Sequence, residues 1–142
     1  MHAYVTIGEQ TRFSKTITDA DMLFFAGISG DFDPVHTDDE YAKSTPFGRR
    51  IAYGLLTLAL MSGPESEMSR RIVERKCPWK PVTLGYERVR CLRPAFVGDT
   101  LTAIYTVESL DEEKKRSIGD CRIVNQAGED VLVAKHIMKW VG

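Results

Sequence analysis

The second half of the chain alternates between apolar and polar residues in four successive segments, and this repetition constrains the fold more than any other feature. The segments cover roughly 83–93, 100–109, 116–125 and 130–141, and the turn-like runs LDEEKK and NQAGED separate the last three. In the second segment every odd-numbered position from 101 to 107 is apolar, and most even-numbered positions are polar. A period of two residues is typical of strands with one buried face. The sequence therefore predicts an antiparallel meander of four strands.

The first half of the chain predicts one strand followed by helices. Residues 11–17 have the composition of a strand, and the capping box at Thr18–Asp21 then begins a helix that we expect to be mostly buried. Gly30 is suited to end this helix in a left-handed conformation. A second capping box, Thr37–Glu40, predicts the start of a short helix.

The run IAYGLLTLALM, residues 51–61, is apolar almost all round. Such a pattern is typical of a helix that other elements enclose, so we expect a central helix here. Ser62–Glu65 reads as a further capping box, for a helix over 64–73. One strand, several helices and four strands together predict an α+β fold in which a curled antiparallel sheet wraps around a long helix. At 142 residues, a single domain over 1–142 is the expectation.

Composition and charge exclude several classes of function. The 19 Lys and Arg nearly balance the 20 Asp and Glu, so we expect no nucleic-acid partner. The three cysteines are widely spaced and odd in number, which fits neither a disulfide framework nor a zinc site. No apolar run is long enough for a membrane span. We expect a cytoplasmic protein with reduced thiols, no membrane association and no bound metal.

The stretch SGDFDPVH, residues 29–36, holds the candidate catalytic groups Asp31, Asp33 and His36 between two predicted helix ends. A carboxylate and an imidazole that converge on one point can hold a water molecule. One group takes a proton from the water and the other returns a proton to carbon, as hydration of a double bond requires. Alternatively, these side chains only bind loop amides and carbonyls. The spacing permits convergence but does not require it.

The longer segment GISGDFDPVHTDDEYA resembles the signature of the MaoC-like dehydratases, the (R)-specific enoyl-CoA hydratases. That signature is close to Ser-Gly-Asp-x-Asn-Pro-x-His, followed after five residues by Ala, which is Ala42 here. RRIAYGLLTLALMSG and LRPAFVGDTLTA are similar to the family's central-helix segment and to the strand and turn that follow. The resemblance extends over nearly the whole chain and implies the hotdog fold, a curled antiparallel sheet around a long helix.

The resemblance also implies an activity and the residues that carry it. The expected reaction is the reversible syn hydration of a trans-2-enoyl thioester to the (R)-3-hydroxyacyl thioester. Asp31 and His36 would activate the water, and the amide of Gly54 would hold the thioester carbonyl, although Gly54 alternatively serves close packing. The thioester would be carried by coenzyme A or an acyl carrier protein. No cofactor is implied beyond the coenzyme A of the substrate, and a homodimer or a higher homo-oligomer is expected.

Further residues are expected around this site. Asp33 stands where the family usually has Asn, and Tyr53 stands where it commonly has His. Asp33 alternatively caps local amides, and Ser62, which matches a serine near the family's site, alternatively caps a helix. The candidate side chains for the acyl pocket are Phe24, Phe25, Leu55 and Leu58. The candidates for phosphate contacts are Arg49, Arg50, Arg70, Arg71, Arg88, Arg90 and Arg93.

Two other functions stay open at the level of sequence. One is an acyl-CoA thioesterase on the same fold, in which water attacks the carbonyl carbon. Hotdog thioesterases more often place a lone acid on the central helix, and this chain has none between Ile51 and Gly63. The other is a non-catalytic module that binds acyl thioesters, because a fold by itself does not decide function.

Overall fold

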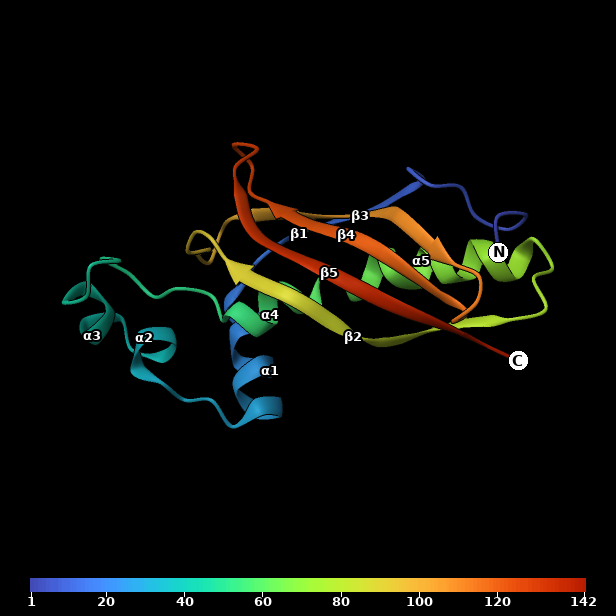
Figure 1. Ribbon diagram of the computed structural model, residues 1–142. Helices are drawn as coiled ribbons and strands as arrows, with labels where there is room; N and C mark the ends of the chain where they lie inside the picture. The colour runs from blue at the N-terminus through green and yellow to red at the C-terminus, as the bar shows by residue number, and fades with distance from the viewer.

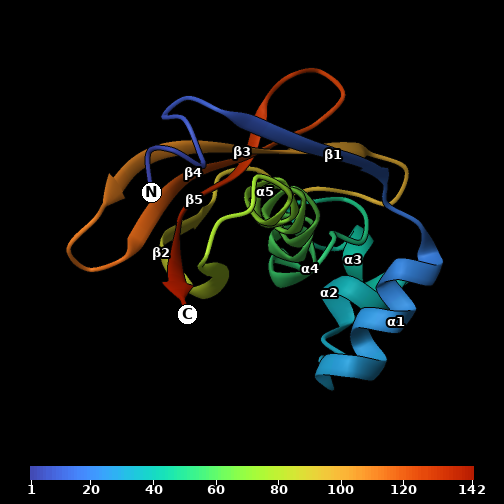
Figure 2. The same cartoon turned by 90° about the vertical axis from the view of Figure 1, so that its right-hand side faces the viewer.

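The computed structural model describes residues 1–142 and contains one antiparallel sheet of five strands in the order β1-β3-β4-β5-β2. The sheet curls over a helical layer, while three further helices lie outside the curl (Figures 1 and 2). The predicted strands are confirmed, with small shifts at their ends, but the predicted four-strand meander is wrong. Only the last three strands pair in succession, and the strand before them pairs with the last strand of the chain at the edge of the sheet. The strands are β1 (Gln10–Thr16), β2 (Lys80–Cys91), β3 (Thr100–Asp111), β4 (Arg116–Val124) and β5 (Asp130–Val141).

The concave face of the sheet forms the core, as the alternation in β3 predicts. Leu101, Ala103, Tyr105 and Val107 all point into it and are at most 2% exposed. The ring of Tyr105 covers Gly119 of β4 so closely that a Cβ atom on the glycine would lie 2.1 Å from a ring carbon. This position in the sheet therefore accepts only a residue without a side chain.

The central helix consists of two pieces that follow one another beneath the sheet (Figure 1). Its first piece begins later than predicted, at Gly54, because Ile51 is extended and bridges to Phe96. The predicted cap at Ser62 is wrong: Met61 already has helical backbone angles, so Ser62 lies inside the second piece and makes no capping bond. No helix in the chain is both long and apolar enough to cross a bilayer. The pieces are α4 (Gly54–Ala59) and α5 (Ser62–Glu74).

Helix α1 (Asp19–Ser29) begins and ends as predicted but is not mostly buried. Both bonds of the capping box are present, and Gly30 ends the helix with a φ of 73°. However, Leu23 is 74% exposed and Ile28 83% exposed. The prediction fails because α1 lies beside the curled sheet and not beneath it, so only one side of the helix packs against the chain (Figure 2).

Two short helices, α2 (Pro34–Thr37) and α3 (Asp39–Lys43), follow α1. The capping residue of α3 is Asp38 and not the predicted Thr37. The Asp38 carboxylate accepts hydrogen bonds from two amides of α3, at 2.9 and 3.0 Å. Thr37 instead ends α2, and its hydroxyl donates to the carbonyls of two preceding residues. The acidic residue thus takes the cap because it is the stronger acceptor.

Arg50 ties α1 to α3. Its guanidinium contacts the carboxylates of Asp19 and Asp39, each at 2.7 Å, and these contacts raise the pKa of Arg50. One side chain therefore links the two helices on either side of the connection that includes the SGDFDPVH stretch. This occupied arginine is not free to contact a substrate phosphate.

A buried polar cluster joins α5 to the sheet. Glu65 is 4% exposed, accepts a hydrogen bond from the Tyr86 hydroxyl at 2.7 Å, and lies 3.5 Å from Nε2 of the fully buried His136. Burial raises the pKa of Glu65 to about 7 and lowers the pKa of His136 to about 4. At pH 5.5 the favoured state is therefore a protonated acid beside a neutral imidazole.

Candidate active site

The SGDFDPVH stretch is shaped by two successive turns in which an aspartate side chain binds the backbone. The carboxylate of Asp31 accepts from the amide of Asp33 at 3.1 Å, and the carboxylate of Asp33 accepts from the amide of Val35 at 2.9 Å. The second bond caps α2, whose first residue is Pro34. Short aspartate side chains favour such turns, which explains why the chain leaves the helix here.

His36 is held in one orientation by the main chain that leads into α4. Its Nδ1 lies 2.8 Å from the carbonyl oxygen of Ile51. A carbonyl oxygen only accepts hydrogen bonds, so Nδ1 carries the proton. In the neutral ring, Nε2 is then the free basic nitrogen.

Tyr53, the residue before Gly54, lies against the same loop. Its hydroxyl donates to the main-chain carbonyl of Asp31 at 2.8 Å. Its ring faces the imidazole of His36, with ring centroids 4.1 Å apart. The start of the central helix is thereby connected to both candidate catalytic residues.

Asp31, His36, Tyr53 and Gly54 all line one hollow of about 230 Å³, which we name the Asp31 hollow. The structure therefore brings together the residues that the sequence analysis placed at the catalytic and carbonyl-binding positions. The remaining lining is mainly apolar. It consists of Phe25, Leu55, Val89 and Cys91.

A second hollow of about 360 Å³, the Arg93 hollow, also includes His36, Gly54 and Cys91. These three shared residues mark where the two hollows meet. A Cβ atom on Gly54 would lie 3.0 Å from the sulfur of Cys91, so the glycine keeps this junction open. The other lining residues are Phe47, Ile51, Ala52, Thr57, Leu92, Arg93, Pro94, Val131 and Leu132.

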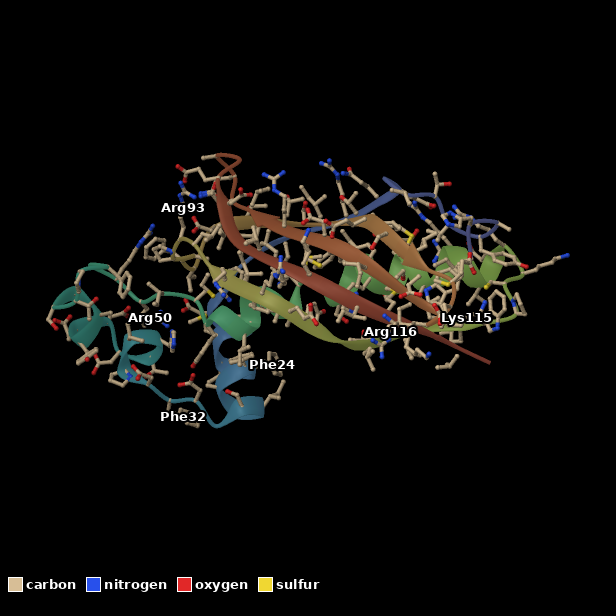
Figure 3. All side chains as sticks on the ribbon, in the orientation of Figure 1. Phe24, Phe32, Arg50, Arg93, Lys115 and Arg116 are labelled. Carbon is tan, nitrogen blue, oxygen red and sulfur yellow. The ribbon has the colours of Figure 1, made fainter.

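The predicted acyl-pocket residues divide into two groups. Phe25 and Leu55 line the Asp31 hollow. Leu58 instead packs against the hydrophobic core, and Phe24 is 72% exposed and lines neither hollow. Phe24 and Phe32 lie at the end of the molecule formed by α1, opposite Lys115 and Arg116 (Figure 3). The exposed Ser62 also lines neither hollow.

Arg50 lines a hollow with His36 but is held by Asp19 and Asp39. Of the other predicted phosphate contacts, only Arg93 lines a hollow that also contains His36. Its guanidinium donates to the carbonyl of Asp130 at 2.9 Å, and it remains 49% exposed. Arg88 and Arg90 line a separate hollow with Asp120 and Lys135, so the structure does not bring them to His36.

Sequence reasoning missed several lining residues, including Cys91, which lines both hollows. Val89 and Cys91 belong to β2, Phe47 precedes Arg50, and Leu132 belongs to β5. Nothing in the local sequence pattern distinguishes Val89, Cys91 and Leu132 from other members of their strands. Only the order of strands in the sheet places these three near His36.

Comparisons with known proteins give one consistent result. The sequence profile of the MaoC like domain matches residues 3–128. The chain is 31% identical to an (R)-specific enoyl-CoA hydratase of Aeromonas caviae, over 94% of this chain and 93% of that one. It is 32% identical to an (R)-specific enoyl-CoA hydratase of Rhodospirillum rubrum, over 76% and 69% of the two chains. The solved structure of the A. caviae (R)-hydratase superposes with a TM-score of 0.79 at 32% identity, covering 95% of this chain and 96% of that one.

Proposed function

Because the chain belongs to the MaoC-like domain family, we propose that it catalyses the reversible syn hydration of a trans-2-enoyl thioester to the (R)-3-hydroxyacyl thioester. The relatives with 31 and 32% identity are both named as (R)-specific enoyl-CoA hydratases. The observation that carries the proposal is the shared lining of the Asp31 hollow by Asp31, His36 and Gly54. An aspartate, a histidine and the first residue of a helix thus line one small space.

In the proposed reaction, Asp31 and His36 hold the attacking water between them. Because Nδ1 of His36 bonds the Ile51 carbonyl, Nε2 is left to accept a hydrogen bond from the water. The Asp31 carboxylate accepts the second one, which leaves an oxygen lone pair of the water free for C3 of the substrate. As the C3–O bond forms, one of the pair takes a proton from the water and then delivers that proton to C2 on the same face, so both groups end in the state in which they began.

Gly54 is proposed to stabilise the negative charge that develops on the thioester oxygen. It is the first residue of α4, and no side chain caps the amides of this helix start. Amides aimed at a developing oxyanion are an effective source of catalysis. The missing side chain at Gly54 also leaves room between the two hollows, where the thioester would lie.

Hydration of crotonyl-CoA tests the proposal. We expect the absorbance of the conjugated enone to fall without release of free thiol, and chiral analysis of the product to give the (R)-3-hydroxyacyl thioester. Release of thiol without hydration would instead indicate a thioesterase. Tight binding with neither reaction would indicate a binding module. The first acid after the start of the central helix, Glu65, is buried under the sheet beside Tyr86, which disfavours a thioesterase.

The proposed chemistry needs no redox step, so it calls for no cofactor other than the coenzyme A of the substrate. An acyl carrier protein remains the alternative carrier. Arg93, which lines the Arg93 hollow, is the proposed contact for a phosphate of the carrier. All three cysteines are unpaired, which is compatible with the cytoplasm as the proposed location.

We further propose that a second copy of the chain covers the exposed apolar surface of α1. Leu23, Phe24 and Ile28 are each more than 70% exposed on this one short helix, and Phe32, which follows the helix, is 64% exposed. Exposed apolar side chains gathered on one element mark an interaction site. The expected molar mass in sedimentation equilibrium is at least twice 16.0 kDa.

The same experiment on two variants locates the interface. Ile28→Asp is expected to shift the population toward the monomer, because the charge would be buried without a partner. Val73→Asp on α5, at a position that is 45% exposed, is the matched control and should leave the mass unchanged. A monomeric wild-type protein would contradict this proposal.

A further inference from the structure

Tyr53 contacts both members of the proposed catalytic pair. Its hydroxyl bonds the carbonyl of Asp31 at 2.8 Å, and its ring lies 4.1 Å from the ring of His36. Its ring also packs against the ring of Phe25, with centroids 4.6 Å apart, and this third contact anchors the side chain. Tyr53 as a whole is 2% exposed. We propose that Tyr53 is a positioning residue that fixes Asp31 and His36 relative to one another. This inference rests on the function proposed above.

Asp31 depends on Tyr53 because its other hydrogen bonds stay within its own loop. Its amide donates to the Ser29 hydroxyl at 3.1 Å, and its carboxylate accepts from the Asp33 amide at 3.1 Å. These bonds set the shape of the loop but not its place on the molecule. The hydroxyl of Tyr53 supplies the link to the central helix, because Tyr53 is the N-cap of α4 and is part of the core.

His36 depends on Tyr53 for a different reason. The bond from Nδ1 to the Ile51 carbonyl fixes one atom of the imidazole but leaves rotation about that bond. The face of the Tyr53 ring, inclined by 33° to the imidazole, limits this rotation. Nε2 is therefore held in a defined direction, as a proton acceptor in a reaction must be.

The phenol stays in the form that this role requires. Burial, followed by the negative charge of Asp31, raises the pKa of Tyr53. Its hydroxyl therefore remains a donor throughout the pH range in which a hydratase would be assayed. Packing alone would be served equally well by Phe, so the hydroxyl separates a positioning role from a merely structural one.

Steady-state kinetics of Tyr53→Phe tests the inference. The variant keeps both ring contacts and loses only the bond to Asp31, so we expect kcat for crotonyl-CoA hydration to fall about tenfold while KM changes less than about twofold. Tyr41→Phe is the matched control, because Tyr41 lies on α3 and is 48% exposed. The control should match the wild type in both constants.

A double-mutant cycle with Asp31→Asn shows whether the effect passes through Asp31. If Tyr53 acts by placing that residue, Tyr53→Phe lowers the residual rate of Asp31→Asn by less than about twofold. An equal, tenfold loss in both backgrounds would mean that Tyr53 acts independently of Asp31, and would overturn the inference. An unchanged kcat in Tyr53→Phe would overturn it as well.

Amide hydrogen exchange gives a readout that does not depend on catalysis. In Tyr53→Phe, peptides covering residues 31–36 are expected to exchange at least about threefold faster than in wild type, while peptides from β3 and β4 stay unchanged. Equal exchange in 31–36 would overturn the inference even if the protein hydrates crotonyl-CoA. Conversely, if the wild type is inactive but exchange is faster in the variant, the proposed function is refuted, while the role of the Tyr53 hydroxyl in holding the loop is supported.

Discussion

Asp31→Asn and His36→Ala are each expected to lower the turnover of enoyl-thioester hydration by about two to four orders of magnitude. Asn is nearly isosteric with Asp and still accepts the bond from the Asp33 amide, so the turn at Asp31 should persist. What disappears is the negative charge that holds the water and accepts its proton. We expect kcat to carry most of the loss, because neither change removes apolar contacts with the acyl chain.

The loss in His36→Ala has two sources, which a further variant separates. His36→Asn retains an amide able to donate to the Ile51 carbonyl, the partner of Nδ1, but has no basic nitrogen. A loss similar to that of His36→Ala would assign the effect to proton transfer, whereas recovery in the Asn variant would assign it to loop geometry.

Controls for both residues come from the same chain. Asp38→Asn preserves an acceptor for the amides at the start of α3 and should leave turnover within about twofold of wild type. His2→Ala, near the N-terminus, should do the same. Wild-type turnover in either Asp31→Asn or His36→Ala would remove that residue from the mechanism.

Glu65→Gln and His136→Gln are expected to change the pH dependence of stability in opposite directions. Glu65 has a folded pKa of about 7 against an ordinary value of 4.5, so the folded state binds more protons in that interval. Its stabilising contribution is complete below pH 4.5 and is lost as the pH rises through 7. Removing Glu65 should therefore make the protein gain stability relative to wild type as the pH rises.

The contribution of His136 to stability changes with pH in the opposite direction. Its folded pKa of about 4 lies below the ordinary value of 6.5, so the unfolded state binds more protons between these values. Stability is thus lost as the pH falls from 6.5 to 4, and His136→Gln should gain relative to wild type on acidification. Each effect amounts to about 3 kcal/mol at its full extent. In the wild type the two slopes largely cancel between pH 4.5 and 6.5.

Urea unfolding at pH 4.5, 5.5 and 6.5 measures these differences as the change in unfolding free energy between each variant and wild type. Glu67→Gln on the same helix is the control. Arg70, and then Arg71, lower the pKa of Glu67, the opposite direction from Glu65, so Glu67→Gln should not gain stability relative to wild type as the pH rises. Slopes of the same sign in Glu65→Gln and His136→Gln would contradict the assignment of a protonated acid beside a neutral imidazole.

The α+β hotdog architecture could be predicted largely because its signals are local. The alternation in β3 and the capping box at Thr18 each depend on residues close together in the chain, and both are confirmed. The cap at Ser62 failed because the helical backbone of Met61 overrode a pattern that fits many sites. The burial of α1 failed because an apolar sequence does not reveal which surface of a folded chain remains open.

The candidate site likewise combines residues that a local motif identifies with residues that only the folded structure brings in. Asp31 and His36 are five positions apart and lie on one connection, so a short motif was enough to identify them as candidates. Cys91 and Arg93 come from the end of β2 and the residues after it, and Leu132 from β5. Their place beside His36 depends on pairing between strands distant in sequence, which no local pattern encodes. The contact from the Tyr53 hydroxyl to Asp31 depends in the same way on where α1 lies.

The packing of Tyr105 on Gly119 also restricts how this sequence can diverge. With a Cβ atom at position 119 only 2.1 Å from the ring, even Ala is excluded there while the tyrosine is present. A lineage can therefore acquire a side chain at position 119 only after position 105 has become smaller. In descendants of this chain, the two positions should change as a pair and in that order.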